Sequence, residues 1–147
     1  MVNHYIICSI TAWFTAQLIK FLITLIKHKK VDFERFVGSG GMPSAHAAFT
    51  CSLTTLVLFI EGFSSAEFAI AFCFMCVVLY DATGVRRETG KQAKVLNTMM
   101  EEWVNQGSTA NFGEHLKELV GHSKTEVIIG FIYGVAIGIT YYLLIVK

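Results

Sequence analysis

A glycine-rich stretch ahead of an apolar run contains the first residue types that could do chemistry. Residues 38–46 read GSGGMPSAH, in which Gly41 ends the glycines, Ser44 stands where a helix N-cap would, and His46 follows. Glycines allow backbone N–H groups to form an anion-binding nest, and the next helix adds the positive end of its dipole. An ordinary loop with a capped helix is the alternative, but His46, which could exchange a proton with the anion, favours a phosphate site.

A second histidine stands just before the last apolar run. His122 is followed by Ser123 and, one helical turn later, by Glu126. A serine followed three residues later by glutamate is typical of a capping box at a helix N-terminus. Alternatively, Glu126 would accept the ring N–H of His122 and raise the nucleophilicity of the other ring nitrogen. The two roles compete for one carboxylate, and the sequence leaves both open.

Cationic side chains accompany both histidines along the chain. A phosphoryl group passing through its transition state needs such charges around it, chiefly for positioning and electrostatic stabilisation. The acidic residues are scattered over a predicted solvated helix and form no metal-binding pattern, so we expect neither a metal nor another cofactor. The candidate cations are Lys29, Arg35, Arg86, Arg87 and Lys117.

Composition places the chain among membrane proteins. It has 147 residues, 54% of them hydrophobic, and a mean hydropathy of +0.55, which exceeds the apolar share of soluble domains. We predict one all-α domain over residues 1–147, an integral membrane helical bundle with about four transmembrane helices. A net charge of +1 gives no field that would attract nucleic acid. The predicted spans are residues 5–27, 46–60, 66–80 and 125–146.

Residues 82–123 form a long polar segment between the last two apolar runs. Apolar side chains recur there at helical spacing opposite charged ones, which predicts an amphipathic helix on the membrane surface. We expect a loop from Asn105 to Gly113 and a short helix from Glu114 to Val120. The apolar stripe consists of Val85, Ala93, Leu96, Met99, Met100 and Trp103.

The distribution of positive charge predicts the orientation of the chain. Ten of the twelve Lys and Arg residues lie in segments 27–45 and 81–124, and the turn between the second and third spans has none. The positive-inside rule therefore places both segments in the cytoplasm and both termini outside. We expect a bacterial inner membrane or an organellar membrane, with the site facing cytoplasm, matrix or stroma.

Glycines recur every four residues in the last apolar run. Gly130, Gly134 and Gly138 would give one face of that helix a smooth groove. The interpretation we favour is packing against another helix of the same bundle. A homo-oligomer contact through the same groove is the alternative.

Three of these stretches together resemble a known family. The sequence MPSAH at residues 42–46 matches the Pro-Ser-Gly/Ala-His motif of the type-2 phosphatidic acid phosphatases, which are relatives of the vanadium-dependent haloperoxidases. His122-x-x-x-Glu126 looks like the closing His-x-x-x-Asp of that family. The block from Asp81 to Asn97 resembles the divergent, small branch of the superfamily. The resemblance covers residues 4 to 145 or so.

The resemblance implies a phosphohistidine mechanism. His122 would attack phosphorus, Glu126 would orient it, and His46 would protonate the leaving alcohol. The chain departs from the wider family in its opening Lys-x6-Arg-Pro motif and in the arginine that would precede His122, where Leu116 stands and Lys117 follows. The phosphate-binding residues implied by position are Lys29, Arg35, Gly41, Ser44, Arg86, Arg87 and Lys117.

The sequence and the resemblance together predict a metal-independent phosphatase. Its substrate would be a lipid phosphate monoester or diphosphate in the bilayer, hydrolysed through a phosphohistidine at the cytoplasmic face. One alternative keeps the pocket without turnover, as a phosphate-binding or lipid-headgroup-binding membrane protein. The other is a structural membrane protein whose glycines serve packing.

Overall fold

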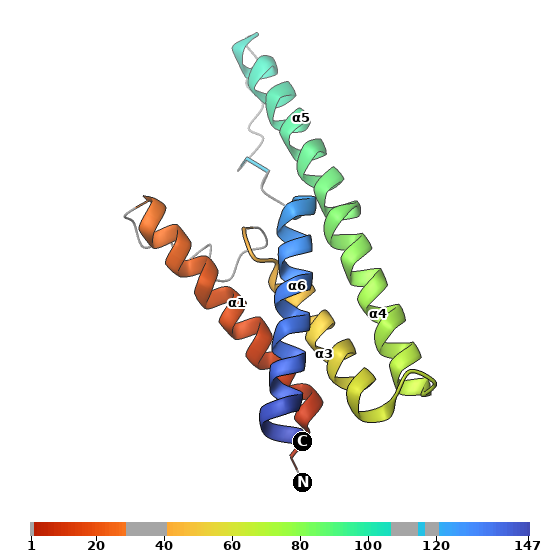
Figure 1. Cartoon of the computed structure of the whole chain (residues 1–147). Helices are drawn as coiled ribbons and strands as arrows, with labels where there is room; N and C mark the ends of the chain where they lie inside the picture. Colours follow the sequence, from red (N-terminus) through yellow and green to blue (C-terminus); the bar gives the residue numbers. More distant parts are fainter. Residues whose placement is uncertain (1, 29–40, 107–114, 117–120) are drawn as a thin grey trace.

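The computed structural model describes residues 2–28, 41–106, 115–116 and 121–147, and the described chain is helical apart from short connections (Figure 1). No strand occurs among these residues, so the predicted all-α class is confirmed. The helices in chain order are α1 (His4–His28), α3 (Ala45–Glu61), α4 (Ala66–Thr83), α5 (Val85–Asn105) and α6 (Lys124–Tyr141), which continues as one π-helical turn, η1 (Tyr142–Val146).

Helix α3 occupies the centre of the bundle and packs against α6, α1 and α4. It begins at Ala45 because the side chain of Ser44 accepts a hydrogen bond from the backbone N–H of Ala47, which confirms the predicted N-cap. It ends at Gly62, whose φ of 86° lies in the region that side chains other than glycine disfavour. The predicted break after residue 60 is therefore confirmed.

Small residues let α6 approach α3 closely. Gly130, Gly134 and Gly138 are all buried on the face of α6 that meets α3. A Cβ atom at Gly130 would lie 2.5 Å from the carbonyl oxygen of Ser44, and one at Gly134 would lie 2.5 Å from that of Ala48. The predicted packing role is confirmed, and a homo-oligomer contact through these glycines would require α6 to leave α3.

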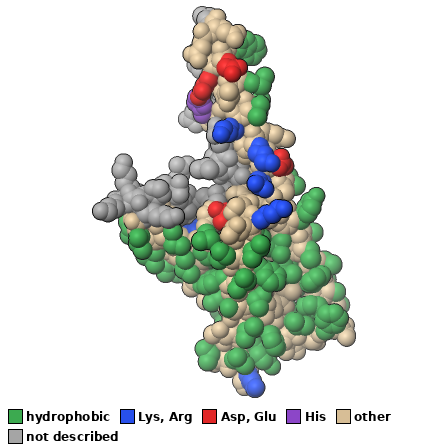
Figure 2. Space-filling model, turned by 45° about the horizontal axis from the view of Figure 1, so that its top comes forward, with side chains coloured by type: hydrophobic (Ala, Val, Ile, Leu, Met, Phe, Trp, Pro, Cys, Tyr) green, Lys and Arg blue, Asp and Glu red, His purple; other side chains and the backbone are tan. Residues whose placement is uncertain are grey.

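Three helical stretches are long and apolar enough to cross a membrane, namely His4–Ile26, Ala66–Asn105 and Lys124–Val146. The fourth predicted span is α3, which has 17 residues. At about 1.5 Å per residue it covers roughly 25 Å, somewhat less than the ~30 Å hydrocarbon core. Hydrophobic side chains cover most of the visible body, whereas most visible charged side chains gather toward the end where α5 projects (Figure 2).

Helix α5 differs from the expectation of a helix lying across the membrane surface. It continues in nearly the direction of α4 and projects beyond the bundle (Figure 1). The two helices are separate at Gly84, whose N–H donates to the carbonyl of Tyr80 at the end of α4 and whose carbonyl accepts from the N–H of Glu88 at the start of α5. Helix α4 extends to Thr83, three residues beyond the predicted third span, residues 66–80.

The structure describes only part of the predicted polar segment after residue 106. The predicted loop from Asn105 to Gly113 and helix from Glu114 to Val120 fall mostly outside the described residues. His115 and Leu116 are described and are not helical. The side chain of Asn97 donates to the carbonyl of Leu116 and accepts from its N–H, both at 2.9 Å, which holds this stretch against α5.

Candidate functional site

Four parts of the chain meet around the N-terminal ends of α3 and α6. The backbone N–H of Ser44 donates to the carbonyl of Glu126 at 3.1 Å, which joins these two helix starts. The backbone N–H of His122 donates to the carbonyl of Ala82, also at 3.1 Å, which adds the end of α4. Helix α1 contributes Lys20, whose side chain contacts Gly41. Residues far apart in the sequence are thereby brought together.

Of the glycines at residues 38–41, only Gly41 lies within the described part of the chain. Gly41 has a φ of +83°, so a side chain there would be strained. Ser44 is fully buried and caps α3. His46 is the second residue of α3 and is exposed. The loop therefore places a free histidine side chain and a helix N-terminus at one point.

His122 is buried beside His46. Only 2% of its surface is exposed, and the two imidazole ring centroids lie 5.8 Å apart with an angle of 81° between the rings. Within the described part of the chain, neither ring nitrogen of His122 has a hydrogen-bond partner. A buried polar group without a partner is uncommon in folded proteins and calls for an explanation, such as a ligand or water at that position.

The segment before His122 presses against the start of α5. Gly121 has a φ of +90°, and a Cβ atom there would lie 2.6 Å from the backbone nitrogen of Arg87 and 2.7 Å from the carbonyl carbon of Arg86. Only glycine permits this approach. The close contact brings the backbone of both predicted arginines to the edge of the site.

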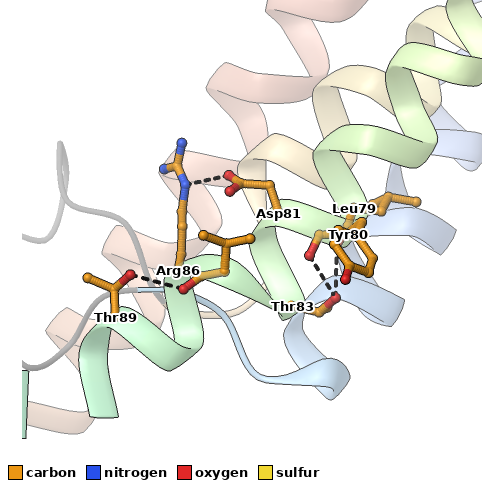
Figure 3. A network of polar contacts seen from close by, with 7 residues as sticks. Leu79, Tyr80, Asp81, Thr83, Arg86 and Thr89 are labelled. Carbon is orange, nitrogen blue, oxygen red and sulfur yellow. Dashed lines mark hydrogen bonds and ion pairs between the residues drawn. The ribbon is translucent and has the colours of Figure 1, made fainter. Parts of the chain in front are cut away.

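Arg86 forms an ion pair with Asp81. Its Nε donates to Oδ2 of Asp81 at 2.6 Å, and both side chains are about half exposed (Figure 3). Arg86 also interacts electrostatically with both histidines. Of the two arginines, Arg86 is therefore the one whose charge reaches the site.

Glu126 completes a capping box at the start of α6. The side chain of Ser123 accepts from the backbone N–H of Glu126 at 3.3 Å, and Oε2 of Glu126 accepts from the N–H of Ser123 at 3.0 Å. The capping role predicted from the sequence is confirmed. The orienting role toward His122 stays a prediction, because the structure shows no hydrogen bond between these two described side chains.

Three of the predicted phosphate-binding residues, Lys29, Arg35 and Lys117, lie outside the described residues. Among the described residues, no three His, Cys, Asp or Glu side chains are grouped so as to hold a metal ion. The predicted residues that the structure brings together are Gly41, Ser44, His46, Arg86, Arg87, His122 and Glu126.

One residue of the site, Lys20, was not assigned to it from the sequence, which left its side chain either extending toward the membrane surface or facing the bundle. Lys20 lies inside the first apolar span, is only 6% exposed, and has its Cδ 3.1 Å from the position of a Cβ at Gly41. Its charge also acts on both histidines. A lysine within an apolar span was the available signal, because such residues usually face the bundle interior.

The environment of His122 favours its neutral form. Burial is the main cause, and the charges of Lys20, His46 and Arg86 add to it, lowering the pKa of His122 to about 4. An ordinary histidine has a pKa of about 6.5. His122 therefore keeps a lone pair on its ring at neutral pH, as a nucleophile or a proton acceptor requires.

This shift predicts a measurable titration. We expect NMR titration of isotope-labelled histidine to show a His122 ring that stays neutral well below pH 6. Arg86→Gln should raise that pKa, because it removes a positive charge that opposes protonation. Arg87→Gln is the matched control and should leave it nearly unchanged. A wild-type His122 titrating near its ordinary value would contradict the buried, cation-flanked site.

Comparison with known proteins shows the family of the chain. The chain matches the model of the divergent PAP2 family over residues 1–137. It is 35% identical over 144 residues to the uncharacterized membrane protein YuiD of Bacillus subtilis (strain 168), covering 92% of this chain and 91% of YuiD. No solved structure matches the chain significantly. The family match includes the glycine loop and both histidines, and the chain therefore belongs to the divergent PAP2 family of membrane proteins.

Proposed function

We propose that the protein is a metal-independent phosphatase that hydrolyses a lipid phosphate monoester or diphosphate through a phosphohistidine. The observation that carries the proposal is the buried imidazole of His122, with neither ring nitrogen paired, 5.8 Å between centroids from the imidazole of His46. One neutral histidine facing a second histidine supplies a nucleophile and a proton donor for the same phosphate. Membership of a phosphatase-related family supports this chemistry.

In the first step, a neutral ring nitrogen of His122 forms a bond to phosphorus while the bond from phosphorus to the ester oxygen breaks. Burial and the charges of Arg86 and Lys20 lower the pKa of His46 in the free site, and the negative charge of the bound phosphate would favour its imidazolium form. The ester oxygen takes a proton from that imidazolium and leaves as an alcohol. In the second step, water attacks phosphorus, neutral His46 takes a proton from that water, and the phosphorus–nitrogen bond breaks. Phosphate is released and both histidines return to their starting states.

The phosphate oxygens carry the negative charge that must be stabilised. In the proposal, backbone N–H groups of the loop at Gly41 and the hydroxyl of Ser44 donate to them at the N-terminus of α3. Arg86 supplies positive charge from the start of α5. Lys29, Arg35 and Lys117 are further candidates for the same role.

Glu126 would act on His122 while it also caps α6. Its Oε2 accepts from Ser123, and the proposal assigns Oε1 to the ring N–H of His122. That contact would select one tautomer and stabilise the positive charge that the ring acquires when it bonds to phosphorus.

A second candidate function is phosphate or lipid-headgroup binding without turnover. The observation that favours it is the same capping box, because the carboxylate expected to orient His122 is already engaged by Ser123. Without an orienting partner, His122 would bind an anion but attack it poorly.

Phosphate release from a panel of lipid phosphates separates the two functions. The purified protein would be assayed in mixed micelles against phosphatidic acid and a polyprenyl diphosphate, without added metal and with chelator present. Release from either lipid supports the phosphatase. Saturable binding of the same lipids without release supports the binding protein instead.

The orientation of the site is a separate prediction. In a variant without the natural cysteines, new cysteines near residues 38 and 108 should react with impermeant reagents only from the cytoplasmic side, and one at Ser64 only from the opposite side. Short basic loops resist translocation, and the turn between α3 and α4 lacks Lys and Arg. The site would then act on lipid phosphates of the inner leaflet.

Labelling of residue 38 from outside would contradict this orientation. The site residues lie at the same end of the bundle, so they would all move to the outer face together. The expected substrates would then be outer-leaflet carrier lipids such as polyprenyl diphosphates.

A further inference from the structure

Lys20 is a buried cation inside a membrane-spanning helix. It lies in α1 (His4–His28), eight positions before His28. At about 1.5 Å per residue, that is roughly 12 Å along the axis below the end of the helix. Only 6% of its surface is exposed. A charged side chain at such a depth is costly, and it usually faces a polar interior site rather than lipid.

The contacts of Lys20 place it at the phosphate site described above. Its Cδ and Cγ lie 3.1 and 3.5 Å from the position of a Cβ at Gly41, so the stem of the side chain lies beside Gly41. Its charge acts on His46 and His122, and that of Glu126 acts on it. Lys20 is thus in electrostatic contact with each of the three proposed catalytic residues.

Glu126, the acidic group whose charge acts on Lys20, also caps α6 through the backbone N–H of Ser123. The interior of the site also contains the unpartnered ring of His122, 2% exposed. A cation beside a buried group without a hydrogen-bond partner is an arrangement that an anion would complete.

We propose that Lys20 binds an oxygen of the phosphate group from within the membrane-spanning part of α1. This inference rests on the proposed function only in taking phosphate as the ligand, and it requires no turnover. The depth of Lys20 favours a phosphate ester presented by the bilayer over a free one. Free phosphate and a lipid headgroup share the same chemistry, so both are used as probes.

The test compares Lys20→Met with Lys124→Met in the full-length protein in nanodiscs. Both variants remove one positive charge, but Lys124 is an exposed first residue of α6. Inorganic phosphate is titrated against nanodiscs of phosphatidylcholine, and the ring signal of His122 is followed by NMR. We expect Lys20→Met to weaken phosphate binding by about tenfold or more. Lys124→Met should change it little.

A second arm distinguishes the source of the phosphate. Phosphatidic acid is incorporated into the nanodiscs in place of the inorganic ion. A bilayer-presented substrate predicts a larger loss of binding in Lys20→Met for phosphatidic acid than for inorganic phosphate. Equal binding of both probes to Lys20→Met and the wild type would overturn the proposal.

Two further measurements separate a binding role from a structural one. Lys20→Met should raise the pKa of His122, because it removes a neighbouring positive charge, and Lys20→Arg should keep both that pKa and part of the phosphate binding. If Lys20→Met is unstable, Lys20→Gln replaces it, with the same expected loss. An unchanged His122 titration in a folded, uncharged variant would overturn the placement of Lys20 at the site.

The inference and the proposed function fail in different ways. Weaker phosphate binding in Lys20→Met, together with a wild-type protein that releases no phosphate, supports Lys20 and contradicts the phosphatase. Phosphate release by the wild type, together with an unchanged KM in Lys20→Met, contradicts Lys20 and leaves the phosphatase standing.

Discussion

Replacing His122 with alanine is expected to abolish phosphate release while the protein stays folded. His122 is the proposed nucleophile, and its ring centroid lies 5.8 Å from that of His46. Loss of a covalent nucleophile typically costs about 10⁴-fold or more in rate. The measurement is phosphate release from the lipid that gives the highest wild-type rate. An acid-labile, base-stable phosphorylated protein should form in the wild type and be absent from the variant.

The control for this experiment is His115→Ala. His115 is exposed and lies in the stretch held against α5 by Asn97, so its loss should leave the rate unchanged. His122→Gln provides a second variant that fills more of the buried space if the alanine variant unfolds. Turnover at the wild-type rate in a folded His122 variant would exclude the phosphohistidine mechanism.

Replacing His46 with alanine is expected to slow the reaction by about 10²–10⁴-fold for substrates with poor leaving groups. His46 would donate the proton that an alkoxide needs, whereas an activated aryl phosphate leaves readily without one. The loss on the aryl phosphate should therefore be much smaller. The measurement is kcat on both substrates, so that any loss of binding is seen separately in KM.

His4→Ala is a matched control for His46, since it removes a histidine at the far end of the bundle. Its side chain contacts the hydroxyl of Tyr141 at 3.3 Å and has no contact with the site. Equal losses on both substrates in His46→Ala would point to a binding or structural role for His46. The general-acid assignment would then be wrong.

The two experiments also decide between the candidate functions. A binding protein needs His122 and His46 only as neighbours of the anion. Alanine at either position would then weaken binding modestly, and neither the wild type nor the variants would release phosphate. A phosphatase needs them as chemically different groups. Only the phosphatase predicts that the two variants respond differently to the leaving group.

Local sequence patterns were sufficient to predict the main helices of this fold. Long apolar runs give helices that can cross a bilayer, and Ser44 and Ser123 begin α3 and α6 as caps. These features depend on residues within one or two turns of each other, so they are determined wherever the helix packs. The motif around His46 and the spacing of His122 and Glu126 likewise indicated the family that the comparisons confirm.

The position of Lys20 could not be derived in that way. The sequence allowed its side chain either to extend toward the membrane surface or to face the bundle. The choice depends on which face of α1 meets α3 and α6, and that is a contact between distant parts of the chain. Its place beside Gly41 is therefore a result of the tertiary structure.

The junction between α4 and α5 also separates what the sequence determines from what the tertiary structure determines. A glycine after an apolar run commonly marks a helix end, and α4 does end before Gly84, yet α5 begins directly after the same residue and projects nearly in line with α4. Gly121 then packs against the backbone of Arg86 and Arg87. The sequence by itself determined the helices, their caps and the two histidines. Only tertiary packing decided which cations stand beside those histidines, because the helix faces that meet are chosen by shape and burial between elements rather than by spacing within them.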